Sequence, residues 1–260
     1  MKSIISKKLL SIAFVAFASL AFFQPNKGLE IAKKSKQNDE GFQSYSVDVK
    51  MVITNKNGQS VINLLNQKNL EIKNDGDKSL IEFKSPKDVK DTKTLTFTHK
   101  SSDDDQWIYL PAIKRVKRIA SSNKSGPFVG SEFAFEDLSS FEVEKYAYKF
   151  LKDSKLNNQN VALVESIPND PKSGYSKQIV YFNIDEDYRV EKIEFFDRKG
   201  SKLKTLDYLN YKKYLGKHWR ADKMSMENHQ NGKSTALIFS NYTFKTSLNE
   251  NDFTEASLKK

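Results

Sequence analysis

Short runs in which apolar and polar residues alternate dominate the chain. In the run 45–54, every second side chain is apolar or aromatic: Tyr45, Val47, Val49 and Met51. A period of two residues is typical of a β-strand that buries one face. An Asn-Lys-Asn-Gly turn follows this run and leads into a second apolar run, which predicts a β-hairpin.

Similar runs continue to the end of the chain and predict a series of strands. After 45–54 we expect strands at 59–65, 68–73, 79–84, 92–100, 106–110, 114–119, 145–152, 160–166, 177–184, 189–197, 203–211, 218–227 and 234–244. Turn-forming residues separate many of them, so consecutive strands should pair antiparallel. One helix is predicted over 28–38, and a short second helix is expected near Glu136.

The number of strands limits the possible architectures. An antiparallel sheet of about a dozen strands cannot remain flat, because strand twist accumulates and open edges invite aggregation. We therefore expect a mainly β, single-domain fold, a half-open antiparallel β-barrel capped by short helices. A curled sheet of this size encloses more volume than its own side chains fill, which predicts an apolar cavity.

The first residues resemble a secretory signal. Three lysines, Lys2, Lys7 and Lys8, precede an uncharged apolar run over 9–23. This run is short for a membrane span, which needs about 20 apolar residues, although an uncleaved anchor remains the alternative. Small residues allow cleavage after Ala18 or Ala21. We assign residues 1–21 to the signal and 22–260 to the exported domain, which is expected in the periplasm of a cell with two membranes.

Charge and cysteine content restrict the partners of such a protein. Loss of the signal removes three lysines and lowers the formal charge from +10 to +7. In an exported protein this balance favours anionic surfaces over nucleic acid, although plain solubility is the alternative explanation. The chain has no cysteine, so disulfides, thiolate metal sites and a lipid attached to cysteine are excluded.

The stretch 107–119, WIYLPAIKRVKRI, combines an apolar half with a basic half. Trp107 and Tyr109 should share one face of a strand, and Pro111 should end its ladder because proline lacks an amide donor. Four cations then crowd into five positions: Lys114, Arg115, Lys117 and Arg118. We expect this cluster to contact an anionic headgroup or a partner, since arginine binds phosphate bidentately. A solvated basic strand is the alternative.

Groups that could perform chemistry are scarce. The three histidines, His99, His218 and His229, have no close sequence partners that would suggest a metal site or a triad, so packed or surface histidines are expected. The acidic triplets 103–105 and 185–187 fall at expected turns and lack the spacing of a calcium loop. Glu132, Glu136 and Asp137 are expected to cap or to face solvent rather than form a catalytic acid pair. We predict no catalytic residue, no metal, no cofactor and no enzymatic activity.

The segment 126–137, GPFVGSEFAFED, carries glycines that allow sharp bends and three aromatic rings: Phe128, Phe133 and Phe135. It is not a phosphate loop, because the glycine spacing and the lysine of that motif are missing. The rings either plug the core of the barrel or line a lipid pocket.

These residues carry a resemblance to a known family. WIYLPAIKRVKRI at 107–119, followed by FVGSEFAFED at 128–137, resembles the signature segment of the outer-membrane lipoprotein-sorting family, the LolA-like proteins. The likeness is to the branch often found beside large lipid-exporting transporters. The stretch 181–223, with IDEDYRVEKIEFFDRKG and GKHWR, is similar to the same family, so the likeness covers nearly all of the exported domain.

The resemblance implies a half-open barrel whose apolar cavity takes up acyl chains in the periplasm. It implies a carrier of lipid or lipoprotein acyl chains between the inner and outer membranes, working with a membrane transporter or an outer-membrane acceptor. We expect a monomer with transient membrane contact and no nucleic acid. The lipid-binding candidates are Trp107, Tyr109, Phe128, Phe133 and Phe135. The alternative is a lipid- or lipoprotein-sensing regulatory module that acts through a protein partner.

Overall fold

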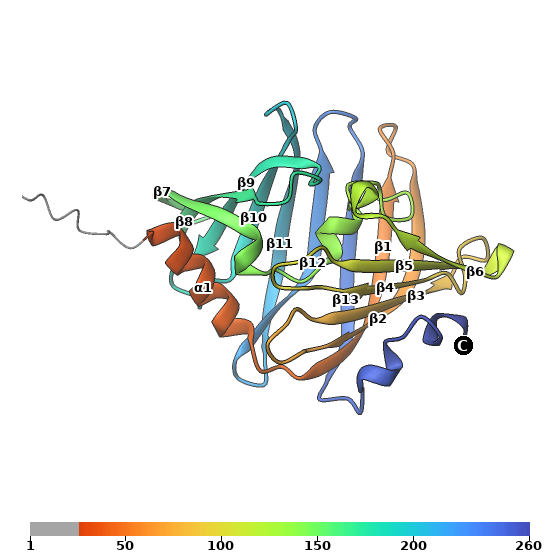
Figure 1. Cartoon of the computed structure of the whole chain (residues 1–260). Coiled ribbons are helices and arrows are strands. Elements are labelled where there is room, and N and C mark those ends of the chain that lie inside the picture. The colour runs from red at the N-terminus through yellow and green to blue at the C-terminus, as the bar shows by residue number, and fades with distance from the viewer. Residues whose placement is uncertain (1–25) are drawn as a thin grey trace, which may run out of the picture.

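The computed structural model describes residues 26–260, and the expected signal, residues 1–21, lies outside them. In the described chain a helix, α1 (Lys27–Asp39), precedes one large antiparallel sheet (Figure 1). The strands are β1 (Ser44–Thr54), β2 (Ser60–Leu70), β3 (Lys78–Ser85), β4 (Lys93–Phe97), β5 (Asp105–Leu110), β6 (Arg115–Ile119), β7 (Tyr146–Leu156), β8 (Gln159–Pro168), β9 (Tyr175–Asn183), β10 (Val190–Asp197), β11 (Lys202–Tyr214), β12 (His218–Asn228) and β13 (Ser234–Phe244). The prediction of a mainly β, antiparallel fold is confirmed.

The expected strands agree with the observed ones except in one place. The predicted strand 68–73 does not exist separately, because β2 continues to Leu70 and pairs with β1 along its whole length. The polar residues between the two predicted strands lie within this ladder, where Asn66 Nδ2 donates to Asp48 Oδ1 at 2.9 Å. The short helix expected near Glu136 is a 3₁₀ turn, Phe135–Leu138.

The order of the strands leaves the sheet open. It runs β6-β5-β4-β3-β2-β1-β13-β12-β11-β10-β9-β8-β7, so each strand pairs with the next in sequence except β6 and β7. The seam between the two halves is made by β1 and β13, with Tyr45 opposite Phe244. The half-open character expected of the barrel therefore comes from the unpaired edges β6 and β7.

The concave face of the sheet holds the largest apolar cluster. Val47, Val49 and Met51 of β1 are all buried there, so the face predicted from the alternating pattern is confirmed. The cluster continues across the seam through Leu237 of β13 and Met226 of β12. Strands from both halves of the chain thus line one common interior.

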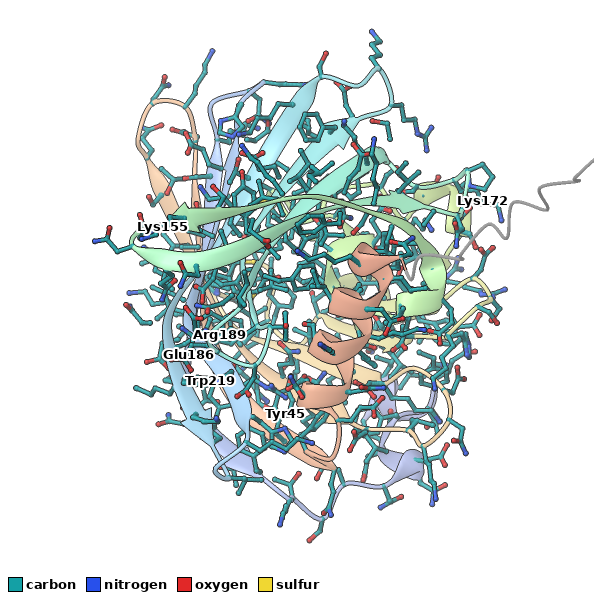
Figure 2. All side chains as sticks on the ribbon, turned by 90° about the vertical axis from the view of Figure 1, so that its left-hand side faces the viewer. Tyr45, Lys155, Lys172, Glu186, Arg189 and Trp219 are labelled. Atoms are coloured by element: carbon teal, nitrogen blue, oxygen red, sulfur yellow. The ribbon has the colours of Figure 1, made fainter. Side chains whose placement is uncertain are left out.

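Helix α1 packs beside β7 (Figure 2), and hydrogen bonds tie both of its ends to the sheet. At its N-terminus Asn26 Nδ2 donates to the carbonyl of Tyr148 at 2.8 Å, on the edge strand β7. At its C-terminus Asp39 accepts a hydrogen bond from the guanidinium of Arg220 on β12. Ile31 and Ala32 are buried in a second apolar cluster with residues of β7, β8 and β9. None of the helices in the described chain is long and apolar enough to cross a membrane.

The last residues cover the outer face of the first half of the sheet. Two 3₁₀ turns, Glu250–Asp252 and Ser257–Lys259, carry Phe253 and Leu258 into a third apolar cluster. This cluster includes Leu80 and Leu95, whose side chains point away from the concave face because neighbouring residues of a strand alternate. The part of the sheet around Leu80 and Leu95 is therefore covered on its outer face, whereas Ile62 and Leu64 of β2 remain exposed.

Candidate functional site

The segment that joins the two free edge strands, residues 120–145, enters the concave interior of the sheet. We call its part 126–138 the plug. Within the plug, the amide of Phe128 donates to the carbonyl of Phe133 at 2.7 Å, so the chain folds back on itself. The turn requires positive φ at Val129 and Gly130, 44° and 78°, and glycine adopts such a conformation without steric cost.

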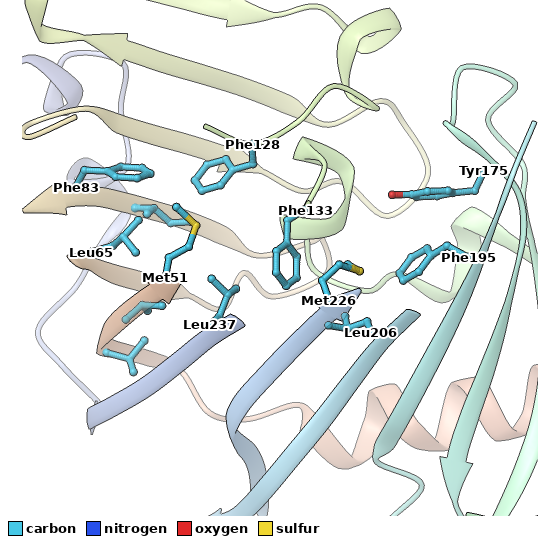
Figure 3. Close-up of a cluster of buried hydrophobic side chains, with 13 residues drawn as sticks. Met51, Leu65, Phe83, Phe128, Phe133, Tyr175, Phe195, Leu206, Met226 and Leu237 are labelled. Carbon is cyan, nitrogen blue, oxygen red and sulfur yellow. The ribbon is translucent and has the colours of Figure 1, made fainter. Parts of the chain in front are cut away.

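The aromatic rings of the plug fill the interior (Figure 3). Phe128 is 3% exposed and Phe133 is 1% exposed. The Phe128 ring packs against Phe83 of β3 at 5.8 Å between centroids and against Phe135 at 5.6 Å. An apolar pocket of about 20 Å³ lies beside these rings, between Met51 and Leu237. These rings thus occupy part of the interior in which an apolar cavity was expected, and the cavity itself stays a prediction.

A larger cleft of about 460 Å³ opens beside the plug. Its volume is within the range of small-ligand pockets, roughly 300–1,000 Å³. Aromatic and aliphatic residues form its inner part: Tyr175, Ile193, Phe195, Leu206 and Tyr208. Charged residues surround them: Asp103, Asp104, Lys124, Glu144, Lys145 and Asp170. Tyr175, Phe195 and Leu206 also belong to the interior cluster, so the cleft reaches the apolar core that the plug rings occupy.

A buried ion pair holds the plug against the sheet. Asp137 Oδ2 lies 2.6 Å from Lys204 Nζ of β11, and both side chains are at most 5% exposed. Asp137 Oδ1 accepts a hydrogen bond from the hydroxyl of Tyr175 at 2.7 Å, while Lys204 Nζ also donates to the carbonyl of Glu132 at 2.9 Å. A buried charge is tolerated when it is paired and hydrogen-bonded, and both partners here meet that condition.

The other two acids of the plug also bind the sheet. Glu136 accepts hydrogen bonds from Ser173 Oγ at 2.8 Å and from the amide of Gly174 at 2.9 Å. Burial raises the pKa of the Glu136 carboxyl, although both hydrogen bonds act in the opposite direction. Glu132 accepts from Asn228 Nδ2 at 2.7 Å. Of the three acids, Asp137 has the expected capping role, because it accepts a hydrogen bond from the amide of Ala134. Glu132 and Glu136 instead bind residues outside the plug.

Lys204 is not among the site residues predicted above, although the sequence carries a signal for it. Lys204 lies on the same face of β11 as Leu206 and Tyr208, and both of these face the interior. A lysine at an inward position of an amphipathic strand demands a buried partner. The partner itself, Asp137, cannot be identified from such a pattern.

The structure divides the predicted lipid-binding residues into two groups. Phe128 and Phe133 lie in the interior cluster, and Phe135 packs against it. Trp107 and Tyr109 instead pack against the outer cluster beneath the C-terminal residues, where the Trp107 and Phe97 ring centroids are 5.1 Å apart. The sheet separates the two groups, so each is a distinct apolar site.

The basic cluster lies at an open edge of the sheet. Lys114, Arg115, Lys117 and Arg118 are all exposed, on β6 and on the turn before it. Arg118 forms an ion pair with Asp105 of β5. Within residues 26–260, Lys114, Arg115 and Lys117 form no salt bridge with a carboxylate.

His99 has two carboxylate partners, one from the loop before β3 and one from the neighbouring strand β5. Its Nδ1 is 2.8 Å from Asp75 Oδ2, and its Nε2 is 3.3 Å from Asp105 Oδ2. Burial lowers the pKa of His99, but the hydrogen bonds to both carboxylates outweigh it and leave the pKa raised. In the part of the chain that the structure describes, no group of three or more histidine or acidic side chains is placed to hold a metal ion.

Comparison with known proteins identifies the family to which this chain belongs. A family model described as "Uncharacterized protein" matches residues 75–260. A crystal structure of a Vibrio parahaemolyticus domain named for outer membrane lipoprotein sorting is 53% identical, covers 90% of this chain and 99% of its own, and superimposes with a TM-score of 0.88. The chain belongs to the outer membrane lipoprotein-sorting family.

Two less similar solved structures share the fold. A DUF1329 family protein from Desulfovibrio piger is 25% identical, covers 89% of this chain and 97% of its own, and has a TM-score of 0.84. A LolA superfamily protein from Nitrosomonas europaea is 19% identical, covers 88% and 98%, and has a TM-score of 0.71, which shows the same fold. The comparison with curated proteins gives no match. The family resemblance noted at 107–137 is thus supported, while its specific motif remains a prediction.

Proposed function

We propose that this lipoprotein-sorting family member is a carrier that binds the acyl chains of a lipid or lipoprotein inside its curved sheet. The observation that supports this most directly is the plug. Its rings, Phe128 and Phe133, fill an apolar interior that adjoins an open cleft. An acyl chain entering from the cleft would take the place of these rings, and the plug would move aside.

The energetics allow such an exchange. Each methylene that leaves water returns about 0.8 kcal/mol, so ten methylenes return ~8 kcal/mol. A displaced phenylalanine side chain loses ~2–3 kcal/mol of burial. A long acyl chain therefore offsets the exposure of two rings with several kcal/mol left to open the polar contacts of the plug.

The proposed carrier works between the inner and outer membranes, in the periplasm, and receives or delivers its cargo at a membrane transporter or an outer-membrane acceptor. The mixed lining of the cleft suits this task. Tyr175 and Phe195 on its inner side offer apolar contact to a chain, while charged residues such as Lys124 and Asp170 at the rim meet a polar headgroup.

The test compares two equally buried rings. Phe133 and Phe253 are each 1% exposed, but Phe133 fills the interior and Phe253 covers the outer cluster of Trp107 and Tyr109. Both Phe133→Ala and Phe253→Ala should lower stability by about 3–5 kcal/mol. Only Phe133→Ala should increase binding of a fluorescent fatty-acyl probe, because it frees interior volume for the chain.

Each result has a defined meaning. Tighter binding in Phe253→Ala alone would move the acyl site to the outer cluster with Trp107 and Tyr109. Absence of probe binding by the wild type and both variants would overturn the carrier role. A stable complex with a protein partner, in that case, would favour the regulatory module.

A further inference from the structure

Two turns of the described chain expose a large apolar residue next to several cations. Ile113 is 51% exposed in the 3₁₀ turn Pro111–Ile113, between β5 and β6. Leu215 is 52% exposed in the turn between β11 and β12. The two side chains are thus closely matched in exposure, and each has lysines or arginines beside it in sequence.

The cations of the two turns differ in their pairing. Around Leu215, Lys212 lies 2.7 Å from Asp222, Lys213 lies 2.9 Å from Asp187, and Lys217 donates to the carbonyl of Glu40 at 2.6 Å. Around Ile113, the cations Lys114, Arg115 and Lys117 have no such salt bridge within residues 26–260. The β5–β6 turn therefore presents uncompensated positive charge around an exposed apolar side chain.

The β5–β6 turn is also held in a defined position. The amide of Lys114 donates to the carbonyl of Pro111 at 3.1 Å, and Lys114 has φ of 52°. Behind the turn, Tyr109 and Val116 lie opposite each other in the ladder and pack against the outer cluster beneath the C-terminal residues. The turn forms the tip of the β5–β6 hairpin, at the right-hand end of these strands (Figure 1). Little conformational entropy of the backbone would be lost when such a turn binds a surface.

The second free edge of the sheet gives a useful contrast. Edge strand β7 is partly covered, because Asn26 donates to the carbonyl of Tyr148 and Gly28 packs against the backbone at Phe150. Charged residues on β6 alone would be explained as protection of an edge strand from aggregation. Protection of the edge does not explain why Ile113, beyond the strand, remains exposed among them.

We propose that the β5–β6 turn docks the protein on the anionic surface of a lipid bilayer. Ile113 enters the interfacial region, and Lys114, Arg115 and Lys117 contact lipid phosphates. Arg118 contributes less, because Asp105 already compensates its charge. An apolar side chain among free cations combines the two interactions that bring proteins to anionic membranes. The proposal goes beyond the carrier function and does not depend on an acyl site.

The experiment measures cosedimentation of the protein with vesicles of phosphatidylcholine and phosphatidylglycerol, and with vesicles of phosphatidylcholine alone. The test variant is Lys114→Gln/Arg115→Gln/Lys117→Gln. The control, Lys212→Gln/Lys213→Gln/Lys217→Gln, removes the same net charge from the paired turn. Each free cation near an anionic surface contributes roughly fivefold to partitioning, so the test variant should lose at least about tenfold, and the control much less.

A second pair of variants tests the apolar contact. Ile113→Asp should weaken binding to the mixed vesicles, whereas Leu215→Asp should leave it nearly unchanged. Equal losses in the two glutamine variants would reduce the effect to net charge and overturn the proposal. Failure of the wild type to bind mixed vesicles would also overturn it and would leave an acidic protein partner as the alternative for the turn. Uptake of a soluble acyl probe without vesicles, measured in parallel, separates this result from the carrier function.

Discussion

Lys204 of β11 and Asp137 of the plug form an ion pair with 2.6 Å between Nζ and Oδ2 in the interior of the sheet. Residues from two halves of the sequence thus meet at the point where the connection between β6 and β7 rests on the sheet. Since neither side chain is appreciably exposed, the pair resists screening by salt and acts as a fixed point of the plug.

Removal of one partner tests this contact. Lys204→Met leaves the Asp137 carboxylate buried without its cation, and we expect the free energy of unfolding to fall by about 3–5 kcal/mol. Lys202→Met is the control, because Lys202 lies on the same strand and pairs with Glu194 at a more exposed site. Its loss should be under about 1 kcal/mol. Urea unfolding of both variants measures the difference, and similar losses would contradict a special role for Lys204.

Asp77 makes stability depend on pH. Burial raises the pKa of its carboxyl to about 7, with Lys36 lowering it and Glu142 raising it. In the unfolded chain this group titrates near ~3.9. The folded state therefore binds a proton that the unfolded state releases between these values, so the contribution of Asp77 to stability rises as pH falls through 7.

Asp77→Asn isolates this contribution, because the amide is neutral at every pH. We expect the variant to be more stable than the wild type above pH 7 and to lose this advantage toward pH 4. The difference should change by up to about 1.4 kcal/mol for each pH unit. A constant difference across the pH series would show that Asp77 does not titrate in this range.

His99 should also titrate above its usual range. Burial lowers the pKa of His99, but the hydrogen bonds to Asp75 and Asp105 raise it by more, so that the pKa is raised overall. Its stabilising contribution is complete below the unfolded pKa of ~6.5 and is lost as pH rises through the folded pKa. We expect His99→Gln to be less stable than the wild type in acid and nearly equal to it in alkaline solution. An NMR titration of the imidazole that gives a pKa below 6.5 would contradict this assignment.

The N-terminal turn of α1 depends on a glycine. A Cβ atom on Gly28 would lie 2.8 Å from the amide nitrogen of Phe150 and 3.0 Å from the carbonyl carbon of Lys149. Gly28→Ala should therefore destabilise the protein by about 1–3 kcal/mol through overpacking, despite a gain of ~1 kcal/mol in helix propensity. Gln37→Ala, at an exposed position of the same helix, is the control. Thermal unfolding should show a lower midpoint for Gly28→Ala alone.

The strands were predictable because alternation records which residues share a face. Val47, Val49 and Met51 appear as one face in the sequence and form one face in the structure. Alternation does not say which face is inside when both are covered. Trp107 and Ile108 illustrate this, because the C-terminal residues Phe253 and Leu258 give Trp107 an apolar environment on the outer side.

The contacts of the plug were beyond prediction for a different reason. Asp137 and Lys204 come together only because strands from the second half of the chain curve around the plug. His99 likewise meets Asp75, which lies 24 residues earlier in the chain, only in the folded structure. No local pattern encodes such pairings, since the paired residues are distant in sequence and become neighbours only when the sheet has folded.

The seam between β1 and β13 has a consequence for the order in which the sheet is assembled. On either side of the seam, each strand pairs with its neighbour in sequence, so each half can zip up from local hairpins. The seam itself joins residues from opposite ends of the described chain, with Tyr45 opposite Phe244. Contacts of such high sequence separation slow folding. Each half therefore keeps an unpaired edge, β1 or β13, until residues 234–244 pair with 45–54.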